Sequence, residues 1–393
     1  MLEEQMEKRL RVGFVSIEDA SSEASWSGTP LNMLRALRSS PGVDVEVISP
    51  LRRSCRWLYL PFKLWSGLTK KTFEWRREGL SLRCFAAQIE PVVRRKELDV
   101  IFSTSSIPVA RLAPSIPAVF WTDANFHTMD GYYTQNLSSR TQASGRRQEE
   151  AALRRADYAC YASHWAADGA KMFADRERVK VLPFGPNLLI QHTRQDVERW
   201  IRERREARPQ SCTLLFVGRN WVRKGGAIAV ETARKLNEAG IATTLRLVGC
   251  NPPGPLPPFV EVLGHISKSE PQGYKRLVDL YRTSDILILP SRAEPFGIVV
   301  AEAAAFGLPA LVTASGGLAE TVQEGKSGFR LPLESDAALW AERAKTILDA
   351  YAAFASHAYN EFENRLNWSA SARSLVELLR LAAQEKSRTM KIA

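Results

Sequence analysis

The stretch that decides the fold is residues 286–303, which read ILILPSRAEPFGIVVAEA. The first four residues are all apolar. This predicts a strand buried on both faces, because a strand with one solvated face would alternate apolar and polar residues. Pro295 and Gly297 then mark a turn, and a helix is expected after them. A strand, a tight turn and a helix in this order predict one unit of a parallel sheet.

The same alternation of short apolar runs and longer helix-period segments recurs along the chain. We expect one strand series at Val12–Ile17, Val43–Ile48, Val100–Ser103, Ala118–Trp121, Tyr158–Ala162 and Val179–Leu182. A second series is expected at Thr213–Val217, Leu245–Val248, Val260–Leu263, Ile286–Leu289, Ala310–Thr313 and Phe329–Leu331. Strands separated by helices indicate parallel units with right-handed crossovers.

The length of 393 residues favours two domains, since a single hydrophobic core rarely serves a chain above about 250–300 residues. The charge-dense segment 194–208, followed by Pro209, reads as a linker or a solvated helix between the two series. The fold class predicted is therefore α/β, with two Rossmann-like, doubly wound parallel-sheet domains facing a cleft. Their expected extents are residues 1–190 and 208–365, and a helix over residues 368–390 is a candidate to pack back on the first domain.

A short sequence similarity between the two strand series supports two domains of similar fold. Asp157 and Asp285 each precede a buried strand, and Ser163 and Ser291 follow six residues later. We expect each serine to cap the helix that follows.

Composition narrows the class of protein. Hydrophobic residues make up 45% and charged residues 25%, as in folded domains, and no apolar run approaches the roughly 20 residues of a membrane span. The five cysteines are scattered, which predicts neither a disulfide framework nor a zinc site and favours a reducing cytoplasm. The net charge of +11 suits anionic partners, but no nucleic-acid module is visible, so no nucleic-acid partner is expected.

A basic aromatic arm, defined as Arg52–Arg77, interleaves arginines and lysines with aromatic residues. One interpretation is peripheral contact with an anionic membrane, at its inner surface, or with a lipid-linked acceptor. The plainer interpretation, which we favour, is a helical arm whose aromatic residues pack inward and whose charges face water.

Two strand-to-helix turns carry residues suited to a charged ligand. Arg219 and Lys224 follow the strand at 213–217 and suit a leaving diphosphate, although a solvated surface turn would look the same. After the strand at 286–289, Glu294 lies beside a helix start whose N–H groups at Phe296, Gly297 and Ile298 suit an anion or sugar hydroxyls. Glu302 lies further along that helix. By itself, a pair of glutamates at this spacing is a weak signal.

The combined pattern resembles the retaining GT-B glycosyltransferases, and within them the large family-four group (glycosyl transferases group 1). The matching residues are Gly218-Arg219, Lys224-Gly225, Glu294-Pro295-Phe296-Gly297, Glu302-Ala303, Gly307-Leu308-Pro309, and Gly316-Gly317 with Glu320. The resemblance covers about residues 211–330 and is diffuse before them.

The resemblance implies a hexosyltransferase that moves a sugar from a nucleotide-diphosphate sugar to an unknown acceptor hydroxyl, with retention. It implies that Arg219 and Lys224 neutralise the diphosphate and that Glu294 holds the sugar with the N–H groups of Phe296, Gly297 and Ile298. Glu302 would accept from the ribose, and Ile266 would lie against the base. No cofactor and no metal is implied, and the first domain would bind the acceptor.

The first domain departs from the family pattern. Its first turn has one glycine, Gly28, where many members have two, and Asp123 or His127 stands where many have a catalytic-face histidine. We expect Asp123 to bind the sugar or the acceptor, unless it only caps its turn. Two alternatives to transfer stay open: a nucleotide-sugar epimerase, and a catalytically silent nucleotide-sugar binding subunit.

Overall fold

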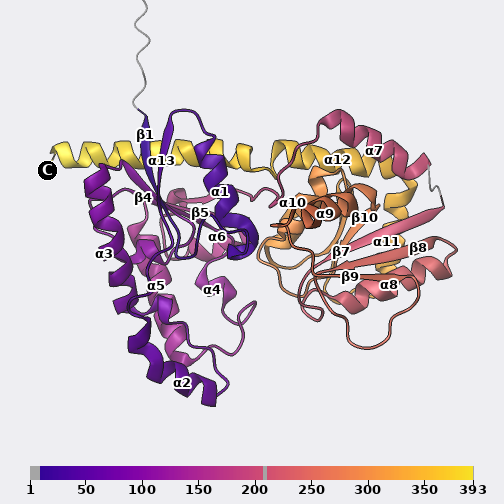
Figure 1. Cartoon of the computed structure of the whole chain (residues 1–393), viewed down its shortest axis with the longest axis horizontal. Coiled ribbons are helices and arrows are strands. Elements are labelled where there is room, and N and C mark those ends of the chain that lie inside the picture. Colours follow the sequence, from indigo (N-terminus) through magenta and orange to yellow (C-terminus); the bar gives the residue numbers. More distant parts are fainter. Residues whose placement is uncertain (1–8, 207–209, 393) are drawn as a thin grey trace, which may run out of the picture. The chain divides into compact units, whose positions relative to one another are not determined.

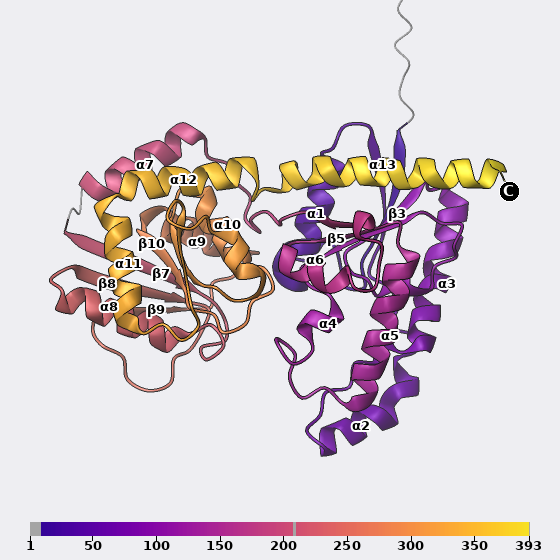
Figure 2. The same ribbon diagram turned by 180° about the vertical axis from the view of Figure 1, so that it is seen from behind.

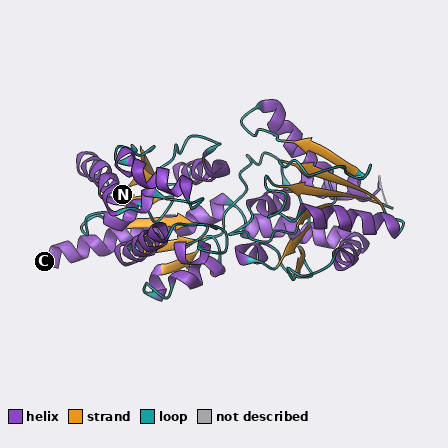
Figure 3. Ribbon diagram, turned by 90° about the horizontal axis from the view of Figure 1, so that it is seen from below, coloured by secondary structure: helices purple, strands orange, loops and turns teal. Residues whose placement is uncertain are grey.

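The computed structural model describes residues 9–206 and 210–392. The chain divides into two compact units (Figure 1). The first unit comprises Met1–Pro183 and Trp368–Ala393, and the second comprises Phe184–Asn367. Within each unit, helices lie on both sides of the strands (Figure 3).

The first unit contains one parallel sheet of six strands in the order β2-β1-β3-β4-β5-β6. Its strands are β1 (Leu10–Val15), β2 (Val43–Ile48), β3 (Val100–Ser103), β4 (Ala118–Thr122), β5 (Tyr158–Tyr161) and β6 (Val179–Val181). Its α-helices are α1 (Thr29–Arg38), α2 (Leu60–Leu68), α3 (Gly79–Lys96), α4 (Phe126–Met129), α5 (Ser139–Arg155), α6 (His164–Ala170) and α13 (Trp368–Ile392).

The second unit repeats this architecture with the strand order β12-β11-β10-β7-β8-β9. Its strands are β7 (Ser211–Val217), β8 (Ala242–Val248), β9 (Val260–Gly264), β10 (Ile286–Leu289), β11 (Ala310–Thr313) and β12 (Gly328–Leu331). Its α-helices are α7 (Arg194–Glu206), α8 (Gly226–Glu238), α9 (Pro271–Thr283), α10 (Ile298–Ala305), α11 (Ala337–Asp349) and α12 (Tyr351–Asn364).

The prediction of two α/β domains, each built on a parallel sheet, is confirmed, and each of the twelve expected strands overlaps an observed one. The central strands β3, β4, β5, β10 and β11 are buried at every residue. Burial on both faces is the reason that their sequences are continuous apolar runs.

Three aspartates fix how neighbouring strands begin. Asp99, Asp157 and Asp285 each precede a strand and accept a hydrogen bond from a backbone N–H of the adjacent strand, at Arg11, Ala118 and Thr213, over 2.7–2.8 Å. The sequence similarity around Asp157 and Asp285 therefore has a structural cause, because both aspartates form the same hydrogen bond to a neighbouring strand.

The expectation for Ser163 and Ser291 holds only for the first. Ser163 caps α6 by accepting from the Ala166 N–H. The expectation is wrong for Ser291, because α10 begins only at Ile298 and the buried Ser291 hydroxyl has no hydrogen-bond partner among the described residues.

The C-terminal helix α13 belongs to the first unit, along which it runs in Figures 1 and 2. It contacts α1, β3 and β4. The Tyr158 hydroxyl donates to Glu385 over 3.1 Å, and the rings of Trp121 and Trp368 meet edge to face at 5.6 Å.

The cysteine pattern needs a correction. Cys55 and Cys84 form a disulfide that joins the start of the basic aromatic arm to α3. They are 29 residues apart, and no spacing rule marks such a pair in the sequence. The expectation of no disulfide is therefore wrong here, and the cysteines no longer support a reducing compartment. Cys160, Cys212 and Cys250 are buried and form no disulfide with a described residue.

No helix within residues 9–206 and 210–392 combines the length and the apolar character needed to cross a membrane.

The segment expected as a linker or solvated helix is a packed helix, as far as it is described. Residues 207 and 208 lie outside the described residues, and α7 covers the rest. Its residues Val197, Trp200 and Ile201 are buried in the core of the second unit. The sequence concealed this because charged residues outnumber apolar ones along the helix, although the apolar residues share one face.

Arg204 on α7 is buried at 3% exposure and pairs with no acidic side chain of a described residue. Instead its guanidinium donates to the Tyr351 hydroxyl and to four backbone carbonyls, those of Tyr281, Arg282, Phe306 and Gly307. These carbonyls lie at the C-terminal ends of α9 and α10, where carbonyls lack partners within the helix and attract a cation. All five N–H groups of the guanidinium therefore have an acceptor.

We expect Arg204→Ala to lower the free energy of unfolding of the second unit by about 3 kcal/mol or more, because several buried carbonyls lose their donor. The measurement is thermal unfolding followed by circular dichroism. Arg202→Ala is the matched control, since this neighbour is exposed and should change stability by less than about 0.5 kcal/mol. Equal melting temperatures for the two variants would contradict the role of Arg204.

Candidate functional site

The candidate site is built from three loops of the second unit that follow β7, β10 and β11. These strands are adjacent, and ligands of such sheets bind beyond the carboxyl ends of the strands. The Arg292 N–H donates to the Arg223 carbonyl over 2.8 Å, and the Ser315 hydroxyl donates to the Arg292 carbonyl over 3.0 Å. Hydrogen bonds therefore join the three loops into one surface.

Two glycines make this close packing of loops feasible. Gly225 has φ +73°, and a Cβ there would lie 2.0 Å from the Pro290 carbonyl oxygen. Gly297 has φ +91°, and a Cβ there would lie 2.5 Å from the Leu318 side chain. Both positions thus require glycine. At Gly225 the backbone thus closely approaches the loop that follows β10.

The loops bring together a carboxylate and two cations. The Lys224 ammonium donates to Oε2 of Glu294, and the Arg223 guanidinium donates to the same oxygen over 3.3 Å. Arg223 also donates to the Ala293 carbonyl over 2.8 Å. The side chains of Lys224 and Glu294 are only 10% and 13% exposed, so water screens this pair weakly.

Lys224 and Glu294 were predicted from the sequence as site residues, but Arg223 was not. The contact between the two loops brings Arg223 to Glu294, and this contact is visible only in the structure. The position of Arg223 directly beside Lys224 was the one indication in the sequence. Arg219, in the same loop, is exposed and forms no ion pair with a described residue.

Glu294 lies just before the N-terminus of α10. Gly297 is the N-cap of this helix in a left-handed conformation, and its carbonyl accepts from the Val300 N–H over 2.9 Å. Phe296 is buried, and its ring meets that of Phe184 edge to face at 5.4 Å. These contacts hold the backbone at Phe296, Gly297 and Ile298 where the positive end of the helix dipole favours a negative or polar group.

Glu302, the second glutamate on this helix, is fully buried. Its Oε2 accepts from the Tyr281 hydroxyl over 2.7 Å, and its Oε1 accepts from the Lys268 ammonium. Burial, and next the nearby Glu302 carboxylate, raise the pKa of the Tyr281 hydroxyl well above its usual value, so Tyr281 stays a donor. Both partners were missed in the sequence, since they lie 21 and 34 residues away.

Lys268 connects Glu302 to the loop after β9. Its side chain is 24% exposed, and it lies two residues after Ile266, which packs against the core of the second unit. Ile266 was predicted to contact a base, and Glu302 to contact a ribose. Lys268 links the segments that carry these two residues, so they are neighbours in the structure.

The first unit has its own polar residues at the carboxyl ends of its strands. Gly28 caps α1 with φ +89°, and Trp26 and Ser27 before it also have positive φ. Left-handed backbone costs a non-glycine residue roughly 1–2 kcal/mol, so the surrounding structure must impose this turn. Asp123 directly follows β4 and is half-buried.

His127 is a packed side chain on α4. Its ring stacks on Phe173 at 4.1 Å, and its buried Nε2 has no hydrogen-bond partner among the described residues. Burial lowers the pKa of the imidazole, and the nearby acids Glu149 and Glu150 offset this in part.

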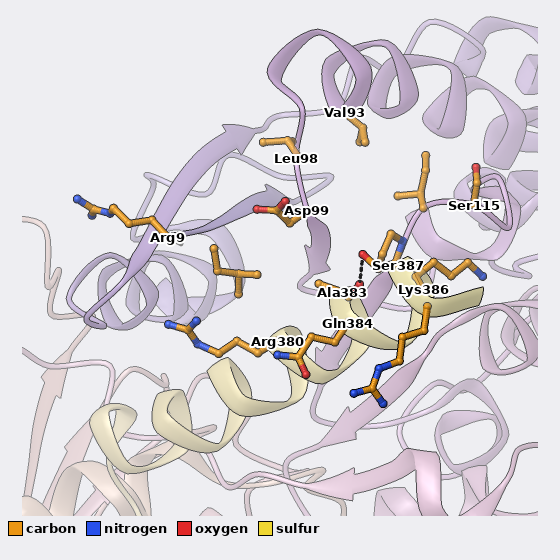
Figure 4. Close-up of a pocket in the computed structure, with 14 residues that line it drawn as sticks. Arg9, Val93, Leu98, Asp99, Ser115, Arg380, Ala383, Gln384, Lys386 and Ser387 are labelled. Carbon is orange, nitrogen blue, oxygen red and sulfur yellow. Dashed lines mark hydrogen bonds between the residues drawn. The ribbon is translucent and has the colours of Figure 1, made fainter. Parts of the chain in front are cut away.

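A pocket of about 560 Å³ in the first unit lies at the amino ends of the strands (Figure 4). Ligands of parallel sheets bind at the carboxyl ends instead. Arg9, Asp99 and Pro117 line it at the amino ends of β1, β3 and β4, together with Arg380 and Gln384 of α13. The candidate residues lie at the carboxyl ends. Within residues 9–206 and 210–392, no group of three or more metal-ligating side chains is found.

Comparison with known proteins supports the assignment of fold and family. The model of the family "Glycosyl transferases group 1" matches residues 211–350. Sucrose-phosphate synthase from Thermosynechococcus elongatus superposes with a TM-score of 0.66 at 17% identity, covering 95% of this chain and 99% of that chain. Anabaena HepE in complex with UDP and glucose gives 0.59 at 18% identity, covering 94% and 99%.

The chain has the GT-B fold, and its residues 211–350 match the model of the glycosyl transferases group 1 family. The resemblance inferred from the sequence is thereby confirmed. D-inositol 3-phosphate glycosyltransferase of Corynebacterium urealyticum is 31% identical over 224 residues, which is 52% of each chain. That of Rhodococcus jostii is 30% identical over 188 residues, 44% of this chain and 41% of the relative. The chain thus spans about half the length, or less, of these curated relatives.

We expect the stability of the first unit to fall as the pH drops through about 6.5, the ordinary pKa of histidine. The pKa of His127 is lowered on folding, so the unfolded chain takes up a proton there before the folded chain does. His127→Phe keeps the ring stack and removes this titration, which should flatten the pH dependence of the melting temperature between pH about 7 and 5. The exposed His357→Gln, in the second unit, is the control. Identical pH profiles for wild type and His127→Phe would contradict the prediction.

Proposed function

We propose that the chain is a hexosyltransferase that moves a sugar from a nucleotide-diphosphate sugar to an acceptor hydroxyl. The observation that carries this is the cluster of Lys224, Arg223 and Glu294 beside the N-terminus of α10, at the carboxyl edge of the second sheet. Glycosyltransferase relatives and the UDP-bound and glucose-bound HepE structure support the same function.

The cluster suits a reaction in which negative charge builds up on a leaving diphosphate. Preorganised cations and a helix N-terminus stabilise such charge most strongly where water is largely excluded. The Lys224 ammonium has three N–H donors, so it can keep Glu294 in place and also reach a diphosphate oxygen. Arg219, which is exposed on the same loop, supplies a further cation.

Other residues of the second unit would bind the sugar and the nucleoside of the donor. Glu294 and the backbone N–H groups of Phe296, Gly297 and Ile298 hold the donor sugar, and Glu302 and Ile266 bind the nucleoside. Retention and independence of a metal are also proposed, and activity that persists in EDTA would support the latter. We place acceptor recognition in the first unit, around Gly28 and Asp123.

We expect Lys224→Ala to lower kcat by about 100-fold or more, the usual effect of removing one preorganised donor from a developing negative charge. The measurement is release of the nucleoside diphosphate from the sugar donor. Lys235→Ala on the surface of α8 is the matched control and should keep its turnover. Full turnover of the Lys224 variant would contradict the proposed role. Conversion of the donor without any acceptor would instead indicate an epimerase.

A thermal-shift panel with UDP, GDP, ADP and their sugar conjugates tests donor binding, beginning with UDP-glucose. A ligand at about 100 times its Kd adds roughly 2.7 kcal/mol of stability, which raises Tm by several degrees. We expect one nucleotide family to stabilise the wild type and Glu302→Gln to lose most of that shift. Tyr281→Phe, which removes one donor but keeps the carboxylate, should retain a shift. A shift without turnover would indicate a silent binding subunit, and no shift at all would contradict the proposal.

A further inference from the structure

The basic aromatic arm carries an unusual share of the exposed apolar surface. Of fourteen large hydrophobic side chains exposed among the described residues, seven lie between residues 57 and 68. Leu68 is 85% exposed, Leu64 69% and Trp57 67%. Trp57, Leu60, Leu64 and Leu68 are spaced by three and four residues, so helix geometry places them along one stripe, with Trp65 beside it. The interpretation that the aromatic residues pack inward is therefore wrong for Trp57 and Trp65.

Other side chains of the arm anchor it to the first unit. The Arg140 guanidinium lies 3.9 Å from the centre of the Phe62 ring and forms two hydrogen bonds with Glu78. Backbone hydrogen bonds join Thr72 to Asn136 and Ser138 over 2.7 and 2.9 Å. Tyr59 is buried and its ring lies 5.9 Å from that of Phe73.

Both ends of the arm are fixed as well. Cys55 is bonded to Cys84, and Arg53 and Arg76 both pair with Glu18 over 2.6 Å. At the far end, Arg77 pairs with the buried Glu149 over 3.5 Å. The apolar stripe is thus presented by a segment that its own contacts hold in place, at the end of the first unit furthest from α13 (Figures 1 and 2).

The segment of chain that carries the stripe has charges of one sign only. Residues 52–73 contain six lysines and arginines and no acidic residue. Five of the six form no ion pair with a described residue: Arg52, Arg56, Lys63, Lys70 and Lys71. A groove of about 500 Å³ is lined by Arg56, Lys63, Trp57 and Tyr59, and also by Glu74.

We propose that the arm docks on an anionic lipid bilayer, with Trp57, Leu64, Trp65 and Leu68 in the headgroup and acyl boundary and the unpaired cations on the lipid phosphates. An apolar stripe flanked by lysine and arginine is the pattern of interfacial helices, and tryptophan prefers the boundary between water and hydrocarbon. A protein partner would need acidic residues to match these cations, whereas an anionic membrane supplies negative charge over its whole surface.

The experiment is co-sedimentation of the full chain with phosphatidylcholine vesicles that contain or lack phosphatidylglycerol, at low and high salt. We expect binding to the anionic vesicles only, and weaker binding at high salt. Lys70→Ala with Lys71→Ala should weaken binding about 25-fold, roughly five-fold for each cation near the surface. Leu64→Ser with Trp65→Ser and Leu68→Ser should abolish it. The assay contains no sugar donor, so its outcome is independent of the proposed transfer.

Matched variants elsewhere separate the arm from general surface effects. Lys326→Ala with Lys345→Ala removes two exposed lysines, and Met172→Ser with Leu333→Ser removes two exposed apolar side chains outside the arm. Both should bind like the wild type. As a second readout, brominated lipids should quench tryptophan fluorescence in the wild type and much less in Trp57→Phe with Trp65→Phe.

Four outcomes would overturn the proposal: no binding by the wild type, equal binding to neutral vesicles, full binding by the Leu64, Trp65 and Leu68 variant, or a wild-type dimer that this variant converts to a monomer. The last result, measured by light scattering, would show that the stripe is an interface between copies of the chain.

Discussion

Burial of both faces of each parallel sheet is the constraint on which the rest of the structure depends. It demands helices on both sides of the strands, and each helix must return the chain to the same edge before the next strand begins. All the strand-to-helix loops of one unit therefore emerge at the carboxyl edge. This geometry alone brings Lys224, Glu294 and Ser315 to one surface, although they lie up to 91 residues apart.

Buried charges are tolerated where the chain supplies every partner. Arg204 has five neutral acceptors, and Glu302 has a tyrosine and a lysine. Burying a polar or charged group without such partners costs more than packing regains. Both clusters lock the ends of α9 or α10, so the helix that presents Gly297 is held at its C-terminal end by Arg204 and along its length by Glu302.

The sequence predicted what depends on local pattern and missed what depends on distant contacts. Continuous apolar runs located the central strands, short runs rich in Val, Ile and Leu located the others, and glycine turns located the loops of the site. Arg223, Tyr281 and Lys268 were missed because only the folded chain brings them to their carboxylates. The Cys55–Cys84 bond and the packing of α7 were missed for the same reason. Positions for Glu294 and Lys224 could be predicted, but their mutual ion pair could not.

That ion pair gives the loop cluster a definite charge. Lys224, Arg223 and Arg219 provide three cations, and Glu294 neutralises one of them, so these side chains carry two positive charges next to a helix N-terminus. Lys224 and Glu294 are mostly shielded from water, so the attraction within this pair is weakly screened. Glu294 therefore has two effects. It holds Lys224 and Arg223 in place when no other anion is bound, and it reduces the repulsion between these cations. An anion that approaches α10 meets cations already held in position, and this preorganisation, more than the number of charges, is what a departing diphosphate requires.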